Sequence, residues 1–162
     1  MLNERIGKIY YKICGLDDLK LEYLSDYKNF DKEKIISKYM DNIEKDIILG
    51  KTTFGIHHDD LRFKFNGFNI KDYGSEGQQK NAIIAYKLSE IDIFYNIRGN
   101  YPILILDDLF SELDKFKINN ILNLIGEDIQ TFITTTEIDK ISSDILNYSR
   151  LIEVVDGIVR ED

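Results

Sequence analysis

Cysteine and proline each occur only once in this chain, and no run of about 18 apolar residues is present. The single cysteine, Cys14, cannot form an internal disulfide, which fits a reducing cytoplasm, and we expect a buried small hydrophobe. The missing apolar run excludes a membrane-spanning helix. The first residues also lack the apolar core of a secretory signal. With so little proline and with apolar residues spread from end to end, the chain is not predicted to be disordered.

Positive charge is also scarce. Lys and Arg together number 21 against 29 for Asp and Glu, so the net charge is −8. Nucleic-acid affinity rests largely on the neutralisation of phosphates by Lys and Arg, so this balance argues against a free-standing DNA-binding domain. Any contact with DNA must come from a local basic patch, from a partner, or from a part of the protein outside this chain.

The 162 residues are 43% hydrophobic, which suits one globular domain with or without an appendage. Residues 17–24 alternate apolar and polar side chains and predict a half-exposed strand. Residues 31–49 have helical spacing, with Asp31 as the expected N-cap and Gly50 as the expected end. A tight hairpin is predicted at Asn66-Gly67.

From residue 77 onward the predicted elements alternate between helix and strand. They are a helix at 77–98, a strand at 103–106 buried on both faces, a helix at 115–125, a strand at 129–136, a helix at 138–146 and a closing hairpin at Asp156-Gly157. This alternation is typical of an α/β fold in which helices cover a mainly parallel sheet.

Asp107 and Asp108 follow the buried strand directly. Ligand sites in open α/β sheets lie outside the carboxyl ends of the strands. Four apolar residues followed by Asp-Asp form the Walker B pattern, in which the first carboxylate holds Mg²⁺ and the next acidic residue activates water. The alternative is that both are solvated loop carboxylates.

A second candidate site lies at the start of the helix beginning near residue 77. The unpaired N–H groups and positive dipole end of a helix N-terminus favour phosphate. Gly77 permits close approach of the backbone, while Ser75 and Gln78 supply hydroxyl and amide donors. The competing interpretation is that Ser75 is simply a helix cap.

Two other patterns invite a functional interpretation that the residues do not support. His57-His58-Asp59-Asp60 resembles a metal site, but His57 and His58 are expected in a strand, with side chains on opposite faces. Gly50-Lys51-Thr52 resembles the end of a phosphate-binding P-loop, G-x-x-x-x-G-K-[ST]. Lys45 occupies the place of its first glycine, and the segment follows a helix rather than a strand.

Four segments together resemble the C-terminal half of the RecF family of bacterial recombination mediators, which share an ATPase class with SMC and ABC proteins. They are "TTFGIHHDDLRFKFNG", "GSEGQQ", "YPILILDDLFSELD" and "IQTFITTT". The resemblance covers about residues 17–160. It implies the returning part of an arm subdomain at residues 1–50 and the C-terminal half of an ABC-type ATPase head at residues 51–162.

The resemblance also implies roles for individual residues. Asp107 matches the Walker B magnesium residue and Asp108 the catalytic carboxylate. Ser75, Gly77 and Gln78 match the signature motif, which contacts ATP bound to the opposite subunit. Ser111 and Asp114 match the D-loop, which crosses the dimer interface beside the nucleotide. Thr135 lies in the run 134–136, at the place where many ABC proteins carry a switch histidine.

The sequence departs from the family pattern at two residues near the histidines and in its lack of a Walker A loop. Ile56 replaces a usual proline and His58 a usual arginine, so a permanent positive charge is lost there. No Walker A loop is present, whereas in RecF it lies in the N-terminal half. The chain is therefore expected to be a C-terminal portion that is inactive alone.

For the complete protein, the resemblance implies an ATP- and Mg²⁺-dependent homodimer in the cytoplasm, at the nucleoid, with no membrane association. It would clamp duplex or gapped DNA, recruit a RecR-type mediator for recombinase loading, and serve DNA replication, repair and the SOS response.

Two alternatives stay open. One is a binding module of the same fold that does not hydrolyse ATP and acts with a separate Walker A chain. The other is a metal-dependent hydrolase that uses Asp59, Asp60, Asp107 and Asp108.

Overall fold

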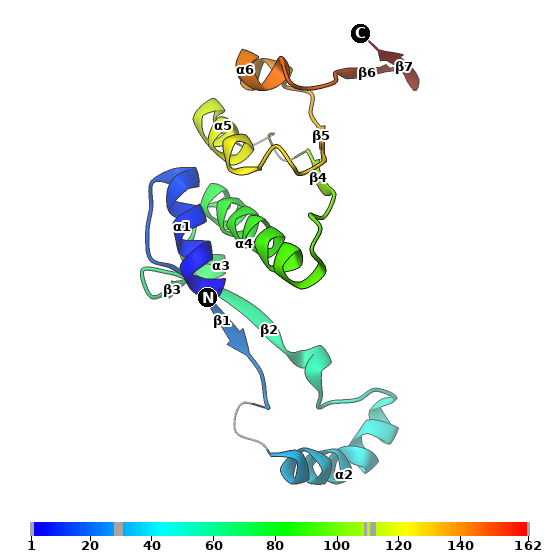
Figure 1. Cartoon of the computed structure of the whole chain (residues 1–162). Coiled ribbons are helices and arrows are strands. Elements are labelled where there is room, and N and C mark those ends of the chain that lie inside the picture. The colour runs from blue at the N-terminus through cyan, green and yellow to red at the C-terminus, as the bar shows by residue number, and fades with distance from the viewer. Residues whose placement is uncertain (1, 28–30, 109, 111–112, 162) are drawn as a thin grey trace. The chain divides into compact units, whose positions relative to one another are not determined.

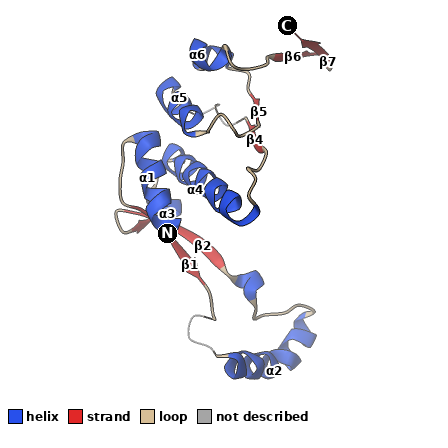
Figure 2. Ribbon diagram, viewed as in Figure 1, coloured by secondary structure: helices blue, strands red, loops and turns tan. Residues whose placement is uncertain are grey.

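The computed structural model describes residues 2–27, 31–108, 110 and 113–161. Contacts along the backbone divide the chain into two compact units, one of Met1–Asp17 with Ser75–Asp162 and one of Asp18–Gly74. Figure 2 distinguishes the helices and strands of both units. The boundaries of these units, after residues 17 and 74, differ from the boundary predicted at residue 50. The assignment of an arm and an ATPase head to parts of this chain stays a prediction.

The unit Asp18–Gly74 contains an antiparallel sheet with the order β1-β2-β3. Its strands are β1 (Leu19–Leu24), β2 (Asp60–Phe65) and β3 (Phe68–Asn69). Between β2 and β3, Asn66 and Gly67 adopt φ values of 49° and 81°. Asn and Gly are the residues that most readily adopt this left-handed conformation, which tight hairpins require. The predicted strand and hairpin are both confirmed.

Helix α2 (Lys32–Leu49) begins and ends where the sequence predicts. The carboxylate of Asp31 accepts a hydrogen bond from Lys34 N–H at 2.8 Å, and Gly50 ends the helix in the left-handed conformation. No residue of α2 is buried, so its apolar stripe is not covered within the described chain. Two short turns complete the unit, the 3₁₀ turn η1 (Ile56–His58) before β2 and α3 (Ile70–Tyr73) after β3.

The other unit has its core where three helices meet, α1 (Leu2–Cys14), α4 (Glu76–Arg98) and α5 (Lys115–Leu124). Figure 1 shows α1 alongside α4. The fully buried side chains from these helices include Ile6, Tyr10, Ile13, Ala82, Ala85, Ile118 and Ile121. Each large apolar side chain buried here contributes about 1.5–3 kcal/mol. No described helix combines the length and apolar character needed to cross a membrane.

Helix α1 was not predicted, although the signal was present. Ile6, Tyr10 and Ile13 recur at spacings of four and three, which is the pattern of one helix face. Polar contacts join α1 to its neighbours: Arg5 Nη1 lies 2.8 Å from Asp92 Oδ2 on α4, and Asn120 Nδ2 of α5 donates to the Ile13 carbonyl at 3.3 Å. Because α1 packs on α4, the first 17 residues group with the C-terminal part of the chain.

Strands β4 (Leu104–Asp107) and β5 (Thr131–Thr134) pair in parallel, as the alternating pattern predicts. The prediction of a strand buried on both faces is wrong for this chain. Ile105 is 69% exposed and Ile103 is 61% exposed, while Leu106 is buried. The physical reason is that β4 pairs only with β5 among the described residues, and only the side that carries Leu106 is buried.

The last part of the chain contains short elements. The helix predicted at 138–146 is instead two separate turns, the 3₁₀ turn η2 (Ile138–Lys140) and α6 (Ser143–Leu146). Strands β6 (Ile152–Val155) and β7 (Ile158–Glu161) form the predicted hairpin. Asp156 and Gly157 take the left-handed conformation at its turn. The α/β class is confirmed by the parallel β4–β5 pair and the alternation of helices and strands around it.

Candidate functional site

The two carboxylates predicted as Walker B lie at the carboxyl edge of the parallel pair. Asp107 is the last residue of β4 and stands opposite Thr134, the last residue of β5. Asp108 follows immediately, with a φ of 45°. Few residues other than glycine adopt this left-handed conformation, and Asp is among the more tolerant. The chain therefore leaves the sheet sharply, with both carboxylates at the edge where ligands bind in such folds.

A single hydroxyl bonds to both aspartates. Thr134 Oγ1 donates to Asp107 Oδ1 at 2.5 Å. The same oxygen accepts a hydrogen bond from the backbone N–H of Asp108 at 3.0 Å. A hydroxyl can donate and accept at once, so the two bonds are compatible. Thr134 was considered in the sequence only as part of a run of three threonines, and its pairing with Asp107 required the register of the sheet.

Helix α4 lies next to the carboxylates. Lys80, Ile83 and Ile84 from its first turns line an open pocket of about 200 Å³ together with Asp107 and Asp108. The residues that line this pocket therefore include one cationic and two anionic ones. The helix that begins with the predicted phosphate-binding residues thus runs beside the predicted metal-binding pair within one compact unit.

The N-terminus of α4 carries a complete capping box. Ser75 Oγ accepts from Gln78 N–H at 3.3 Å, and Gln78 Oε1 accepts from Ser75 N–H at 2.9 Å. Both side chains act here as acceptors. The hydroxyl proton of Ser75 and the amide NH₂ of Gln78 take no part in these bonds. Capping and anion binding are therefore compatible, and the two interpretations of Ser75 do not exclude each other.

Gly77 lies in the first turn of α4, and a β-carbon built there would meet no atom within 4 Å. Its backbone is helical rather than left-handed, so neither packing nor conformation within the described chain requires glycine. Glycine in a helix is less favourable than alanine by roughly 0.5–1 kcal/mol. An open approach to the backbone N–H groups is the feature that glycine provides at this position.

The structure describes one of the two predicted D-loop residues, Asp114. Ser111 lies outside the described residues. Asp114 is the N-cap of α5: its Oδ1 accepts from Lys117 N–H at 2.9 Å and its Oδ2 lies 2.6 Å from Lys117 Nζ. Hydrogen bonds from the Lys117 side chain and backbone lower the pKa of Asp114. Lys140 Nζ lies 3.2 Å from the Leu113 carbonyl just before this cap, and it pairs with Glu137.

We expect Asp114→Ala to destabilise the chain by about 1 kcal/mol, because α5 loses its cap. Asp114→Asn keeps a capping oxygen and removes only the charge, so it is the matched control. A lowered pKa means that the charge stabilises the fold above the unfolded pKa, near 4, and that this gain disappears as pH falls through the lower folded pKa. Urea unfolding at pH 7 and pH 3 tests this: the wild-type advantage over Asn should be smaller at pH 3, whereas a constant difference would contradict it.

Thr135, which the family pattern placed near the nucleotide, has a local role in the structure. Its Oγ1 accepts a hydrogen bond from Glu137 N–H at 3.0 Å, which shapes the turn into η2. Thr134, one residue earlier, is the threonine that contacts the carboxylates. A nucleotide contact of Thr135 stays a prediction.

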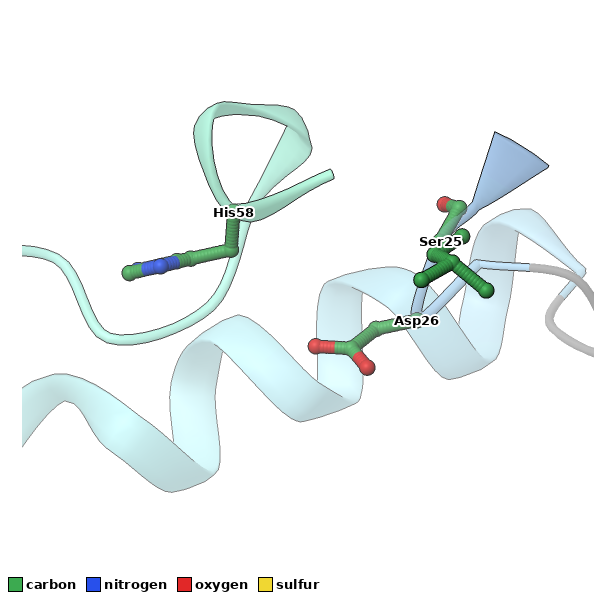
Figure 3. A pocket seen from close by; sticks show the side chains of 4 residues that line it. Ser25, Asp26 and His58 are labelled. Atoms are coloured by element: carbon green, nitrogen blue, oxygen red, sulfur yellow. The ribbon is translucent and has the colours of Figure 1, made fainter. Parts of the chain in front are cut away.

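His57 and His58 are not in a strand, so the reason given above for separating them is wrong. They lie in the 3₁₀ turn η1, where their ring centres are 4.2 Å apart. Both Nε2 atoms lie near the Thr52 carbonyl oxygen, at 3.2 and 3.1 Å. Figure 3 shows His58 with Ser25 and Asp26 around an open pocket of about 340 Å³.

Gly50-Lys51-Thr52 forms a helix C-terminus, which supports its rejection as a P-loop. Gly50 ends α2, and Lys51 N–H donates to the Asp46 carbonyl at 3.2 Å. Thr53 donates its N–H and its hydroxyl to Asp46 Oδ1. The C-terminal end of a helix carries partial negative charge and presents carbonyl groups, so it repels phosphate.

The carboxylates at the end of β4 fit a magnesium ion held together with a nucleotide. Within residues 2–27, 31–108, 110 and 113–161, no group of three or more His, Cys, Asp or Glu side chains could enclose a metal. Mg²⁺ keeps several waters and is held by one or two carboxylates plus substrate phosphates, so it needs no such enclosure. The Thr134 bond uses Oδ1 of Asp107 and leaves Oδ2 for a metal-bound water.

No protein-family model matches the chain. Comparison with individual known sequences finds several RecF proteins. The DNA replication and repair protein RecF of Bacillus velezensis is 41% identical over 152 residues, which cover 88% of this chain and 40% of that protein. RecF of Clostridium kluyveri is 41% identical over 155 residues, covering 93% and 42%. RecF of Ligilactobacillus salivarius is 34% identical over 169 residues, covering 99% and 45%. The chain spans less than half the length of these relatives.

Two solved structures of the recombination mediator protein RecF in the RecFOR pathway share the fold. RecF-ATPrS superposes with a TM-score of 0.73 at 28% identity, and RecF-ATP with a TM-score of 0.71 at 29% identity. Each comparison covers 99% of this chain and 43% of the solved chain. In sequence and in fold, this chain is similar to the C-terminal half of RecF, with an α/β fold of the ABC type.

Proposed function

We propose that this chain supplies the signature motif, Walker B pair and D-loop of a RecF-type ATPase. The observation that carries the proposal is the pairing of Asp107 and Asp108 at the carboxyl edge of β4 and β5, beside helix α4. That helix begins with a glycine-containing N-terminus suited to phosphate. The nucleotide that we propose for this site is ATP, the one named in the RecF-ATP structure.

In this proposal each residue has a definite task. Asp107 holds Mg²⁺ through water, and the bound ion would neutralise the phosphate oxygens of ATP. Asp108 accepts the proton of the attacking water. Ser75, Gly77 and Gln78 would contact the γ-phosphate of ATP held by the opposite subunit. Ser111 and Asp114 would belong to the D-loop, which crosses the dimer contact beside the nucleotide, and Thr135 would act as a γ-phosphate sensor.

The wider role is part of the same proposal, and the support for it is that the relatives are DNA replication and repair proteins. ATP would join two subunits into a clamp on duplex DNA near gaps, and a RecR-type mediator would be recruited to load recombinase. The setting would be the cytoplasm, at the nucleoid. The net charge of −8 supports DNA contacts on other parts of the protein or on a surface that the dimer forms.

The exposed apolar face of β4 and β5 supports the proposal that another part of the complete protein covers it. Ile105 of β4 and Phe132 of β5 both point an apolar side chain to solvent, with Phe132 51% exposed. Ligand-binding parallel sheets are normally covered on both faces. The unmatched part of the relatives, more than half of their length, is the occupant that this proposal assigns to that face.

The test compares the chain alone with a completed protein, in which it follows the N-terminal part of a RecF relative. The chain alone should show no measurable ATP turnover, because it has no Walker A loop. Addition of the separate N-terminal part should restore some turnover, and the completed protein should have more. Substantial turnover by the purified chain, unaffected by Asp107→Asn, would contradict the proposal. Nucleotide-dependent association without any hydrolysis would favour the binding-module alternative.

A further inference from the structure

We infer that Thr134 is a positioning residue for both aspartates at the end of β4, and that its hydroxyl sets the geometry of the metal and water sites. This inference rests on the proposed function and adds a residue to it. Its basis is the pair of bonds made by Oγ1, at 2.5 Å to Asp107 Oδ1 and at 3.0 Å from Asp108 N–H.

The first bond orients the carboxylate of Asp107. With Oδ1 held by the Thr134 hydroxyl, the carboxylate plane is fixed and Oδ2 is the oxygen left for a water of the metal. A β-branched side chain has few accessible χ1 rotamers, so the strand backbone holds the hydroxyl nearly in place. The parallel register puts Thr134 opposite Asp107, so the bond is built into the sheet.

The second bond fixes the backbone of Asp108. This residue has left the strand ladder and has a φ of 45°, a conformation that costs energy for a residue with a β-carbon. Thr134 Oγ1 accepts its N–H and stabilises that conformation. The direction in which the Asp108 carboxylate leaves the sheet then depends on the same hydroxyl that orients Asp107. One side chain thus couples the metal residue to the proposed base.

The neighbouring threonine provides a matched control. Thr135 Oγ1 instead accepts a hydrogen bond from Glu137 N–H, within its own turn. Valine has the shape of threonine without the hydroxyl. Thr134→Val and Thr135→Val therefore remove the same group from adjacent positions, and Thr134→Ser keeps the hydroxyl while it removes only a methyl group.

The first measurement is independent of ATP. Amide hydrogen exchange of the chain, followed by NMR, should show the Asp108 N–H exchanging about tenfold faster in Thr134→Val, since its acceptor is gone. The rate should be unchanged in Thr135→Val and nearly unchanged in Thr134→Ser. An Asp108 exchange rate equal to that of the wild type in Thr134→Val would overturn the inference.

The second measurement uses the completed protein. Thr134→Val should lower kcat about tenfold or more, because the metal residue and the proposed base both lose the hydroxyl that positions them. Binding of Mn²⁺ with a non-hydrolysable ATP analogue, measured by EPR, should weaken about tenfold. Thr134→Ser should restore both values to within about threefold. A purely structural role would instead make Ser as harmful as Val.

Parallel variants separate this inference from the function on which it rests. If Asp107→Asn and Asp108→Asn abolish turnover while Thr134→Val matches the wild type in kcat and Mn²⁺ binding, the inference is wrong and the proposed function stands. If Asp107→Asn and Asp108→Asn leave turnover unchanged, the proposed function is wrong, and the positioning role is overturned with it.

Discussion

Asp108→Asn is expected to leave ATP binding intact and to lower the hydrolysis rate of the completed protein at least about a hundredfold. The amide keeps the size of the side chain and its place after β4, but it cannot accept a proton from the attacking water. Removal of a positioned general base costs typically 10²–10⁴-fold in rate. If the proposed dimer dissociates after hydrolysis, the ATP-bound dimer should live longer. Single-turnover hydrolysis and the lifetime of the dimer measure the two effects.

Asp107→Ala is the comparison for this variant, because it removes the anchor of the metal rather than the base. It should weaken binding of Mg-nucleotide, whereas Asp108→Asn should not. The Thr134 hydroxyl would also lose its acceptor at Oδ1. A normal hydrolysis rate in Asp108→Asn would show that the role given to Asp108 is wrong, whatever the result for Asp107.

Ser75→Arg is expected to abolish ATP-dependent dimerisation of the completed protein, and with it hydrolysis and stable clamping of DNA. A long side chain at the start of α4 would occupy the space into which the phosphate of the other subunit must dock. ATP should still bind to each subunit through its own Walker A loop. Sedimentation with ATP and Mg²⁺ tests this directly, because a normal dimer would return Ser75 to the status of a helix cap.

Two control variants separate bulk from capping. Ser75→Ala removes the Oγ that accepts from Gln78 N–H and should cost about 1 kcal/mol of stability without blocking the site. Its dimer should be weakened less than that of Ser75→Arg. Gly77→Ala introduces a β-carbon that meets no atom of the described residues within 4 Å, so folding should be unaffected or slightly favoured. A weaker dimer in Gly77→Ala would then report a close approach from outside the subunit.

Local features of the fold could be predicted because nearby residues determine them. Asp31 and Gly50 bound α2 since a carboxylate satisfies free N–H groups and glycine tolerates the left-handed end. The hairpins at Asn66-Gly67 and Asp156-Gly157 form where those residues permit positive φ. The Walker B pattern placed two aspartates at the end of a strand for the same kind of reason, and the structure has them there.

Features that depend on distant residues could not be predicted in this way. One local prediction was also wrong: His57 and His58 follow a glycine with a φ of 153° into a 3₁₀ turn rather than a strand, so their rings lie together. Ile105 belongs to an apolar run that looks buried, but burial depends on what covers the strand, and no described layer covers that face.

The sequence by itself determined the order of most helices and strands, the caps of α2 and the hairpin turns, and the chemical groups at the two candidate sites. Those properties depend on contacts within a few residues. Only the tertiary structure decided that α1 joins the core of α4 and α5, and that Thr134 rather than Thr135 reaches the aspartates. Both depend on packing and strand register between segments far apart in the chain, which side-chain patterns within one segment do not specify.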